Sequence, residues 1–217
     1  MDKPSIQQIE NFFPDDVASK VAEFATDYAS YRYGETDNRE APPTGMVSDL
    51  FHWDNKDAMT SAPDHVKLIY NYFIKHIHEK YTGFWNDYQI YRLYINVFAP
   101  REIPYFHTDS VGDSDQWTFI YYPTLDFDYH INQGGCTEFD LDNKIIGVPP
   151  IPNSMCRFSS YVKHRATPFR DYHRFSVAIK CVNKSELQEE SFTDQYTGDE
   201  HSMIGSHHAK GRGSVNN

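Results

Sequence analysis

The chain has 217 residues and a formal net charge of −11 at pH 7, a length that suits one domain with a sizeable core. Its acidic balance argues against general binding to nucleic acids or anionic membranes, because affinity for phosphate groups comes from clustered Lys and Arg. Residues 1–10 lack a signal-peptide pattern, and no stretch reaches the roughly 20 apolar residues that span a bilayer. We therefore expect a cytoplasmic, soluble protein without a membrane partner, whose three cysteines form no disulfide.

Two helices are predicted in the first part of the chain. The first begins after Pro14, where acidic residues suit a helix N-terminus, and apolar residues then recur at helical spacing to Tyr28. The second runs from Asp64 to about Lys80. Its apolar stripe consists of Val66, Ile69, Tyr70, Phe73 and Ile77.

A long loop is predicted between these helices, at residues 35–62. This stretch contains Pro42-Pro43 with several Gly, Asp and Asn residues, and it shows no sustained periodicity. It includes a His-x-Asp triplet at His52, which we interpret as structural or solvated because no matching downstream residues accompany it. Long loops often border functional sites.

The chain becomes strand-like after Gly83. Short runs with strand patterns are separated by turn-forming clusters such as Asn132-Gln133-Gly134-Gly135. The predicted strands are Tyr88–Phe98, Gln116–Tyr122, Thr137–Leu141, Lys144–Val148, Met155–Ser160 and Tyr172–Cys181.

Two helices followed by these strands predict an α+β domain with a double-stranded β-helix (jelly-roll) core buttressed by N-terminal helices. We place this single domain at residues 1–183, with a helical part at 1–83 and the jelly-roll core at 84–183. Residues 184–217 are polar and contain Gly and Ser, as expected of a mobile C-terminal tail.

A candidate metal site lies within the strand-rich part. His107 and Asp109 are two residues apart, so on an extended segment their side chains point the same way. His164 follows near the expected end of the penultimate strand. Two imidazoles and one carboxylate on one face of an octahedron suit Fe(II) and leave positions for a chelating cosubstrate and O₂.

An anchor for a diacid follows ten residues after His164. Arg174 and Ser176 lie at positions i and i+2 of the last predicted strand and therefore face the same side. A guanidinium holds a carboxylate through paired hydrogen bonds, and a nearby hydroxyl adds a donor. Next to an Fe(II) site, this arrangement suggests a 2-oxo diacid whose other end chelates the metal.

These motifs together resemble the Fe(II)/2-oxoglutarate-dependent dioxygenases, and among them the prolyl-hydroxylase-like branch. The similar region runs from about Tyr91 to Val182. It contains the His-x-Asp pair, a strand with two adjacent tyrosines, a Gly-Gly turn, a histidine near a proline, and Arg-x-Ser. The resemblance covers nearly half of the chain.

The resemblance assigns a role to each of these residues. It implies that His107, Asp109 and His164 bind iron and that Arg174 binds the C5 carboxylate of 2-oxoglutarate. It also implies that Tyr121 helps to hold this carboxylate, with Ser176 as a second donor. Because Tyr122 is adjacent to Tyr121, a slip of one residue in the strand would exchange which ring faces inward.

The implied activity is hydroxylation of an unactivated C–H bond with Fe(II), 2-oxoglutarate and O₂, releasing succinate and CO₂. The implied substrate is a prolyl or other amino-acid side chain, free or in a peptide, or a small molecule. Prolyl hydroxylases often have a tyrosine nine or ten residues before the first metal-binding histidine, whereas this chain has Val97-Phe98 there.

Two alternatives remain open at this point. A jelly-roll module could keep a metal site for binding or structure without catalysis, because a fold does not fix a function. A cupin-like metal enzyme could act without 2-oxoglutarate. The Arg174-Phe175-Ser176 motif speaks against this second alternative, because such an enzyme has no use for a diacid anchor.

Overall fold

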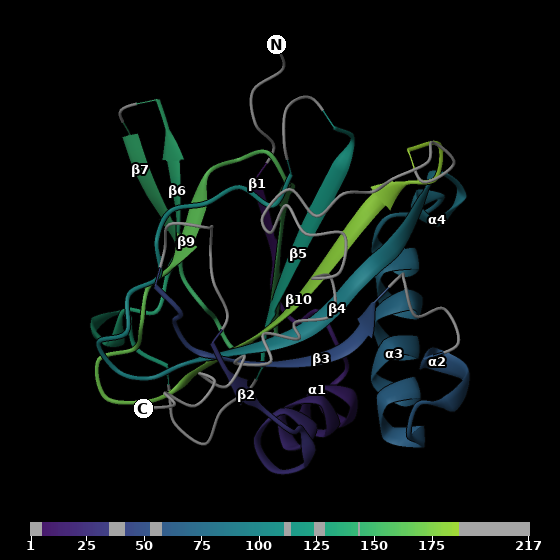
Figure 1. The fold of residues 1–217 in the computed structure, drawn as a ribbon, viewed down its shortest axis with the longest axis horizontal. Helices are drawn as coiled ribbons and strands as arrows, with labels where there is room; N and C mark the ends of the chain where they lie inside the picture. The colour runs from purple at the N-terminus through teal and green to yellow at the C-terminus, as the bar shows by residue number, and fades with distance from the viewer. Residues whose placement is uncertain are drawn as a thin grey trace, which may run out of the picture.

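The computed structural model describes residues 6–34, 42–52, 58–110, 114–123, 129–142 and 144–186 (Figure 1). The helices are α1 (Asp15–Glu23), the π-helix η1 (Phe24–Tyr28), α2 (Ala58–Ser61), α3 (Asp64–Lys80), α4 (Phe84–Asp87) and the 3₁₀ helix η2 (Ile131–Gln133). The strands are β1 (Ile6–Ile9), β2 (Arg32–Tyr33), β3 (Met46–His52), β4 (Tyr88–Phe98), β5 (Gln116–Tyr122), β6 (Thr137–Leu141), β7 (Lys144–Val148), β8 (Ser154–Ser159), β9 (His164–Ala166) and β10 (Arg174–Asn183). Within these ranges, every helix is too short or too polar to cross a membrane.

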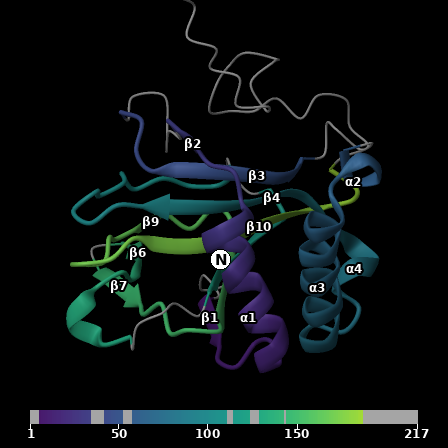
Figure 2. The same ribbon diagram turned by 90° about the horizontal axis from the view of Figure 1, so that it is seen from below.

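The strands form two antiparallel sheets. The large sheet has the order β1-β8-β5-β10-β4-β3-β2, and the small sheet has the order β7-β6-β9. In Figure 2 the small sheet lies at the left and α3 at the right, and the strands of the large sheet run between them. This arrangement confirms the predicted α+β fold with a jelly-roll core.

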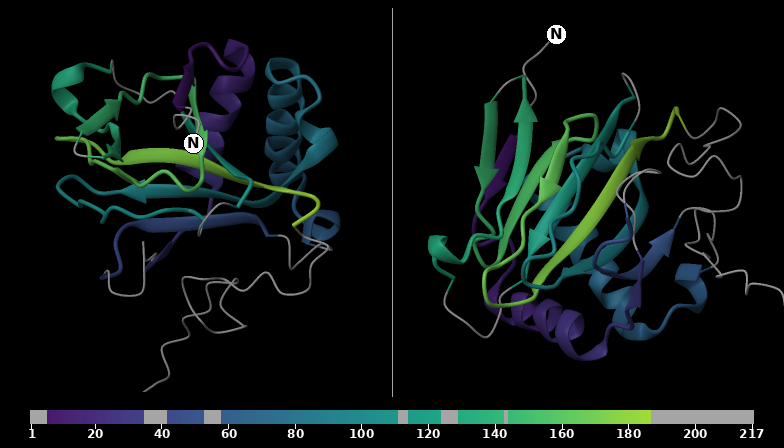
Figure 3. Two further views of the ribbon diagram at one scale, coloured as in Figure 1. Left: turned by 90° about the horizontal axis from the view of Figure 1, so that it is seen from above. Right: turned by 60° about the vertical axis from the view of Figure 1, so that its left-hand side comes forward.

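The N-terminal helices cover one face of the large sheet. Figure 3 shows α1 and α3 side by side along this sheet. The apolar stripe of α3, which includes the fully buried Phe73 and Ile77, packs with residues of the central strands such as Phe119 and Ile179. Both predicted helices are confirmed, and the first continues through η1 to Tyr28 as its spacing indicated.

The predicted strands of the core are also confirmed. Strands β4 to β7 begin and end at the predicted residues, and β8 and β10 are shifted by one or two residues at their ends. The alternation of apolar and polar residues, bounded by turn residues, predicts such strands well because one face of each is buried.

The prediction of a loop over residues 35–62 is wrong for part of that stretch. β3 pairs with β4 over most of its length, and α2 follows it. The strand Met46–His52 contains Ser48 and Asp49 and lacks a clear alternation, so its conformation is decided by pairing with β4 rather than by local pattern. His52 therefore belongs to a strand of the large sheet.

The alternation along β10 divides its side chains between two surroundings. Val177, Ile179 and Cys181 belong to the core beneath the helices. Arg174 and Ser176 face the opposite side, toward the small sheet, where Arg174 donates hydrogen bonds to Ser176 and to Thr137 of β6. The space between the two sheets is therefore lined by polar residues of β10, and it holds the candidate site.

Candidate metal and cosubstrate site

Backbone hydrogen bonds hold the two histidine-bearing segments together. The N–H of His107 donates to the carbonyl of His164 at 2.9 Å, and the N–H of His164 donates to the carbonyl of His107 at 2.8 Å. The N–H of Asp109 donates to the carbonyl of Ser160 at 2.8 Å. The segment 107–109 thus lies beside β9 as an extension of the small sheet, although it is fifty-seven residues away in sequence from His164.

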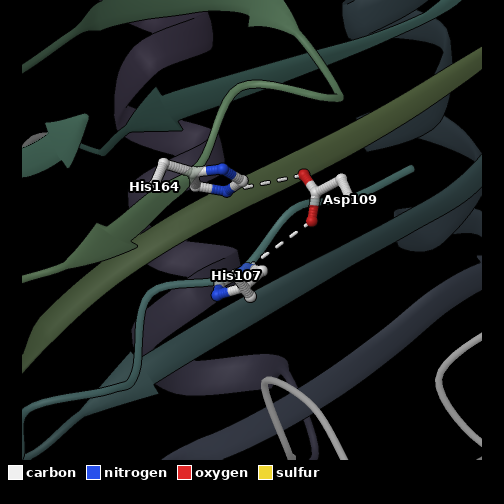
Figure 4. A group of neighbouring side chains, drawn as sticks. All are labelled: His107, Asp109 and His164. Atoms are coloured by element: carbon white, nitrogen blue, oxygen red, sulfur yellow. Dashed lines mark ion pairs between the residues drawn. The ribbon is translucent and has the colours of Figure 1, made fainter. Parts of the chain in front are cut away.

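The three predicted metal ligands converge on one point (Figure 4). One ligand atom from each of His107, Asp109 and His164 lies within 4.8 Å of the others. Nε2 of His107 is 3.5 Å from Oδ1 of Asp109, and Nε2 of His164 is 3.6 Å from Oδ2. Ligands bound at right angles, each about 2.1 Å from a metal ion, would lie about 3 Å apart, so this group needs only a small contraction.

The imidazoles are oriented for metal binding by backbone carbonyls. Nδ1 of His107 lies 3.1 Å from the carbonyl oxygen of Tyr105, and Nδ1 of His164 lies 2.8 Å from that of Val162. Donation from Nδ1 assigns the proton to that nitrogen and leaves the lone pair of Nε2 directed at Asp109. This second contact is typical of histidines that ligate metals.

The carboxylate of Asp109 is held at both oxygens. Thr118 donates a hydrogen bond of 2.6 Å to Oδ2, and Nζ of Lys180 lies 2.8 Å from Oδ1. Burial by itself would raise the pKa of Asp109, but Lys180 and the two histidines hold it well below its usual range. The group is therefore an anion with a fixed plane, as a metal ligand must be.

His164 is neutral at physiological pH. Its side chain is buried, and this burial lowers its pKa to about 4, although the Asp109 carboxylate opposes the shift. A histidine must be deprotonated to ligate a metal ion. Near pH 7, then, a metal ion would not compete with a proton for Nε2 of His164.

Arg174 lies deeper on the same face of β10 and is only 1% exposed. Its Nε donates to the carbonyl of Gly135 at 2.8 Å, Nη1 to the hydroxyl of Ser176 at 3.2 Å and Nη2 to the hydroxyl of Thr137 at 3.0 Å. A guanidinium has five N–H groups, and these three bonds within the described residues use three of them; the hydroxyl of Tyr122 interacts with the same guanidinium. A guanidinium can hold a carboxylate through paired N–H groups.

The tyrosine beside Arg174 is Tyr122. Its ring centroid lies 5.5 Å from the guanidinium carbon, and its hydroxyl is 2.7 Å from that of Thr137. Tyr121 instead points toward the helices, where it packs against Phe13 and Phe73 and donates a hydrogen bond to Asn153 at 3.2 Å. This corrects the expected orientation of Tyr121, because the alternation of β5 directs the neighbouring ring into the site.

Of the predicted site residues, the structure brings together His107, Asp109 and His164 as one group, and Arg174 with Ser176 as another. Thr118, Thr137 and Lys180 complete these groups and were not predicted. The period-two rule could have found Lys180, because it follows Arg174 and Ser176 at even spacing along one strand. Thr118 lies at even spacing before Tyr122 on β5.

The residues fit the implied metal ion and cosubstrate. Two neutral imidazoles and a carboxylate are the donor set that suits Fe(II) with open coordination positions. On the same face of the large sheet, the amide oxygen of Asn96 is buried without a hydrogen-bond partner among the described residues. Asn96 is the register partner of Ser176 on β4. Such an orphaned polar atom marks a place where a polar ligand would be accommodated.

No family model and no curated protein sequence matches this chain. Solved structures do match it. A prolyl hydroxylase from Trichoplax adhaerens, in complex with a peptide fragment of the hypoxia inducible factor oxygen degradation domain, is 15% identical with a TM-score of 0.57 over 86% of this chain and 87% of that one. An oxidoreductase of the 2OG-Fe(II) oxygenase family from Burkholderia pseudomallei is 14% identical, with a TM-score of 0.59 over 82% and 85%.

A non-heme alpha-ketoglutarate-dependent epimerase from nogalamycin biosynthesis is also similar, at 10% identity and a TM-score of 0.56 over 82% of this chain and 78% of that chain. At such identities the likeness concerns the fold. The chain therefore has the double-stranded β-helix fold of the 2-oxoglutarate- and Fe(II)-dependent oxygenases, prolyl hydroxylases included, which confirms at the level of the fold the resemblance predicted from its motifs.

Proposed function

We propose that this protein is an Fe(II)- and 2-oxoglutarate-dependent dioxygenase that hydroxylates an unactivated C–H bond. One observation carries the proposal. The group His107, Asp109 and His164 and the buried guanidinium of Arg174 both lie on the side of the large sheet that faces the small sheet. A structural metal site would require the first group but would not explain a fully buried guanidinium on that side.

His107, Asp109 and His164 would hold Fe(II), and its remaining coordination positions would be open to the cosubstrates. When bound, Fe(II) with 2-oxoglutarate and O₂ supplies oxidative decarboxylation of the cosubstrate to succinate and CO₂, coupled to oxidation of the substrate. The carbonyl oxygens of Tyr105 and Val162 would hold the rings of His107 and His164 in the orientation that points Nε2 at the metal ion.

Arg174 would bind the C5 carboxylate of 2-oxoglutarate, with Tyr122 and Ser176 around it. The hydroxyl of Thr137 accepts from Arg174 and lies beside the hydroxyl of Tyr122, so these side chains form one hydrogen-bonded unit. Because Arg174 is almost fully buried, little water competes for its donors, and a charge-assisted bond there is strong.

The substrate side of the proposal is an amino-acid side chain, free or in a peptide, or a small molecule. The Trichoplax prolyl hydroxylase, which has this fold, is in complex with a peptide. In our chain Val97 belongs to a strand paired with β10, and Phe98 is the register partner of Arg174. Neither residue offers the hydroxyl that prolyl hydroxylases often place there, so a substrate other than peptidyl proline is favoured.

The test is an anaerobic absorption titration of metal-free protein with Fe(II) and then 2-oxoglutarate. We expect a visible charge-transfer band that saturates in the parent protein and that requires at least about tenfold more 2-oxoglutarate in Arg174→Met. Arg170→Met is the matched control, because Arg170 has a side chain that is 74% exposed. It should titrate like the parent.

Asp109→Ala provides the second arm of this test. We expect it to abolish both the band and any release of succinate in air, because it removes the carboxylate ligand. Iron binding without a band in the parent protein would disprove the use of 2-oxoglutarate. It would favour a cupin-like metal enzyme or a binding module instead.

A further inference from the structure

Lys180 is a buried lysine that lies beside the proposed metal group. Its side chain is 10% exposed, and its Nζ lies 2.8 Å from Oδ1 of Asp109, whose side chain is 2% exposed. Among the described residues, Asp109 is the one carboxylate within ion-pair distance of Lys180. An ammonium group is costly to bury, and a bound metal ion would neutralise Asp109 without it. Charge compensation of Asp109 therefore does not explain Lys180 in the loaded site.

The two oxygens of Asp109 have different surroundings (Figure 4). Oδ1 lies 3.5 Å from Nε2 of His107 and is held by the ammonium of Lys180. Oδ2 lies 3.6 Å from Nε2 of His164 and accepts a neutral hydrogen bond of 2.6 Å from Thr118. An ammonium repels a divalent ion, whereas a hydroxyl donor leaves the second lone pair of its acceptor oxygen available. A metal ion is therefore bound more favourably by Oδ2 than by Oδ1.

The number of carboxylate oxygens that bind the metal ion decides how many coordination positions stay open. Two imidazoles and one carboxylate oxygen occupy three of the six octahedral positions. A chelating 2-oxoglutarate takes two more and leaves one for O₂. A carboxylate that binds through both oxygens would take this last position as well. The proposed reaction therefore requires Asp109 to bind through a single oxygen.

We propose that Lys180 is a positioning residue that holds Oδ1 of Asp109 away from the metal ion, so that Asp109 binds through Oδ2 alone. This inference rests on the proposed function and adds a residue to it. Thr118 has a different task, because its hydroxyl orients the carboxylate through Oδ2. Thr118 is the register partner of Lys180 on the neighbouring strand, and this pairing brings both side chains to the same carboxylate.

A role in orientation alone predicts a different response to the loss of Lys180. If Lys180 only oriented Asp109, its removal would weaken metal binding, typically about 10–100-fold. If Lys180 holds back one oxygen, its removal eliminates a repulsive charge and frees a second ligand atom, so metal binding becomes tighter. The direction of the change in metal affinity therefore separates the two roles.

The experiment compares Lys180→Met with the parent protein, both loaded with Mn(II). An EPR titration gives the Kd of Mn(II), and electron spin echo modulation in ²H₂O counts the water molecules on the ion. In Lys180→Met we expect Mn(II) binding that is at least about threefold tighter and one water molecule fewer on the ion. Weaker binding would overturn the inference. Tighter binding with an unchanged water count would also overturn it, because Lys180 would then act only through its charge.

Nitric oxide tests the remaining open position after Fe(II) and saturating 2-oxoglutarate have been added without O₂. It binds Fe(II) at an open position and gives a characteristic EPR signal. We expect Lys180→Met to need at least about tenfold more nitric oxide than the parent protein. The charge-transfer band of 2-oxoglutarate should persist in this variant, because Arg174 and both histidines are unchanged. Equal affinity for nitric oxide in the two proteins would overturn the inference.

Lys163→Met is the matched control, because Lys163 also pairs with an aspartate, Asp140 at 3.3 Å, but has a side chain that is 53% exposed. It should match the parent protein in all three measurements. Thr118→Val is the second comparison, and it should weaken Mn(II) binding without changing the water count. If Lys180→Met fails to fold, Lys180→Gln, which is uncharged and one atom shorter, replaces it. Failure of both to fold with metal present would make Lys180 a structural residue and overturn the inference.

Measurements on the parent protein separate this inference from the proposed function. Absence of metal binding, or of the charge-transfer band with Fe(II) and 2-oxoglutarate, would overturn the proposed function together with this inference. If the parent protein binds both, and Lys180→Met has the same water count and the same affinity for nitric oxide, this inference alone is overturned.

Discussion

Nε of Arg174 donates a hydrogen bond of 2.8 Å to the carbonyl oxygen of Gly135, so the guanidinium of the proposed cosubstrate anchor is positioned by a glycine turn. Gly135 has a φ of +78°, and a Cβ at this residue would lie 2.3 Å from the ring of Phe169. The Gly134-Gly135 turn therefore serves two purposes. Because Gly135 has no side chain, the ring of Phe169 can pack directly against it, and the conformation of the turn points the carbonyl of Gly135 toward Arg174.

Gly135→Ala should lower both stability and cosubstrate affinity. The left-handed conformation costs a non-glycine residue about 1–2 kcal/mol, and the clash with Phe169 adds to this, for a total of at least about 3 kcal/mol in the free energy of unfolding. Any shift of the turn moves the carbonyl away from Arg174 and raises the Kd of 2-oxoglutarate. Urea denaturation and the charge-transfer titration measure the two effects.

The control for this prediction is Gly83→Ala. Gly83 has a similar φ of +85°, but the nearest atom to its added Cβ would be 3.6 Å away. Gly83→Ala should lower the free energy of unfolding only by the cost of the left-handed backbone conformation, about 1–2 kcal/mol, and should keep the affinity for 2-oxoglutarate. Equal losses in the two variants would show that the contact with Phe169 relaxes without cost.

Tyr122→Phe and Tyr121→Phe should have different consequences. Tyr122→Phe removes the hydroxyl beside Thr137 and Arg174, so we expect a several-fold higher Kd for 2-oxoglutarate. Tyr121→Phe removes only the bond to Asn153, so we expect about 1 kcal/mol less stability and an unchanged Kd. If only Tyr121→Phe raised the Kd of 2-oxoglutarate, Tyr121 rather than Tyr122 would face the cosubstrate, as predicted from the sequence.

The faces of β5 illustrate what the sequence could and could not predict. Its alternation and bounding turns predicted the strand itself with correct ends. The adjacent Tyr121 and Tyr122 are both large and amphipathic, so local pattern did not decide which one faces the small sheet. Tertiary packing decides it, because Phe13 and Phe73 from the N-terminal segments receive the ring of Tyr121.

The elements that the sequence did not predict are held by partners distant in the chain. β1 pairs with β8, and β9 has only three residues and pairs with β6. Neither is long enough to show a period. The metal ligands were predictable because a His-x-Asp pair followed by a histidine is a recognisable ligand pattern, whereas Lys180 belongs to no such motif and shows only its even spacing after Arg174 and Ser176.

His164 should make the stability of the metal-free protein depend on pH. Burial lowers its pKa to about 4 in the folded state, against about 6.5 in the unfolded chain. The folded protein therefore binds fewer protons in this interval. Stability is fully present above the unfolded pKa and declines as the pH falls from about 6.5 to about 4, by about 3 kcal/mol in total.

Urea denaturation of metal-free parent and His164→Gln protein at pH 7.5 and pH 5 tests this prediction. The parent should lose about 2 kcal/mol more than the variant over this range. His76 and other groups titrate in both proteins, so their contributions cancel when the loss of unfolding free energy in the variant is subtracted from that in the parent. A parallel pH dependence would contradict the buried, neutral state of His164.

Thr118→Val should weaken metal binding while leaving the fold intact. Valine has nearly the shape of threonine but cannot donate the 2.6 Å hydrogen bond to Oδ2 of Asp109. The carboxylate would then lose its hydrogen bond at Oδ2, keep Lys180 at Oδ1 and rotate more freely before binding a metal ion. Loss of a residue that orients a ligand typically costs 10–100-fold in metal affinity, and Co(II) absorption titrations measure this directly.

Thr26→Val is the control for the substitution itself, because Thr26 is exposed on η1 and bonds only the carbonyl of Ala22. Its Co(II) affinity should equal that of the parent. If Thr118→Val also binds Co(II) like the parent, then Lys180 alone fixes the plane of Asp109. In that case Thr118→Val combined with Lys180→Arg should show the loss, because the longer guanidinium fork cannot reproduce the position of Nζ beside Oδ1.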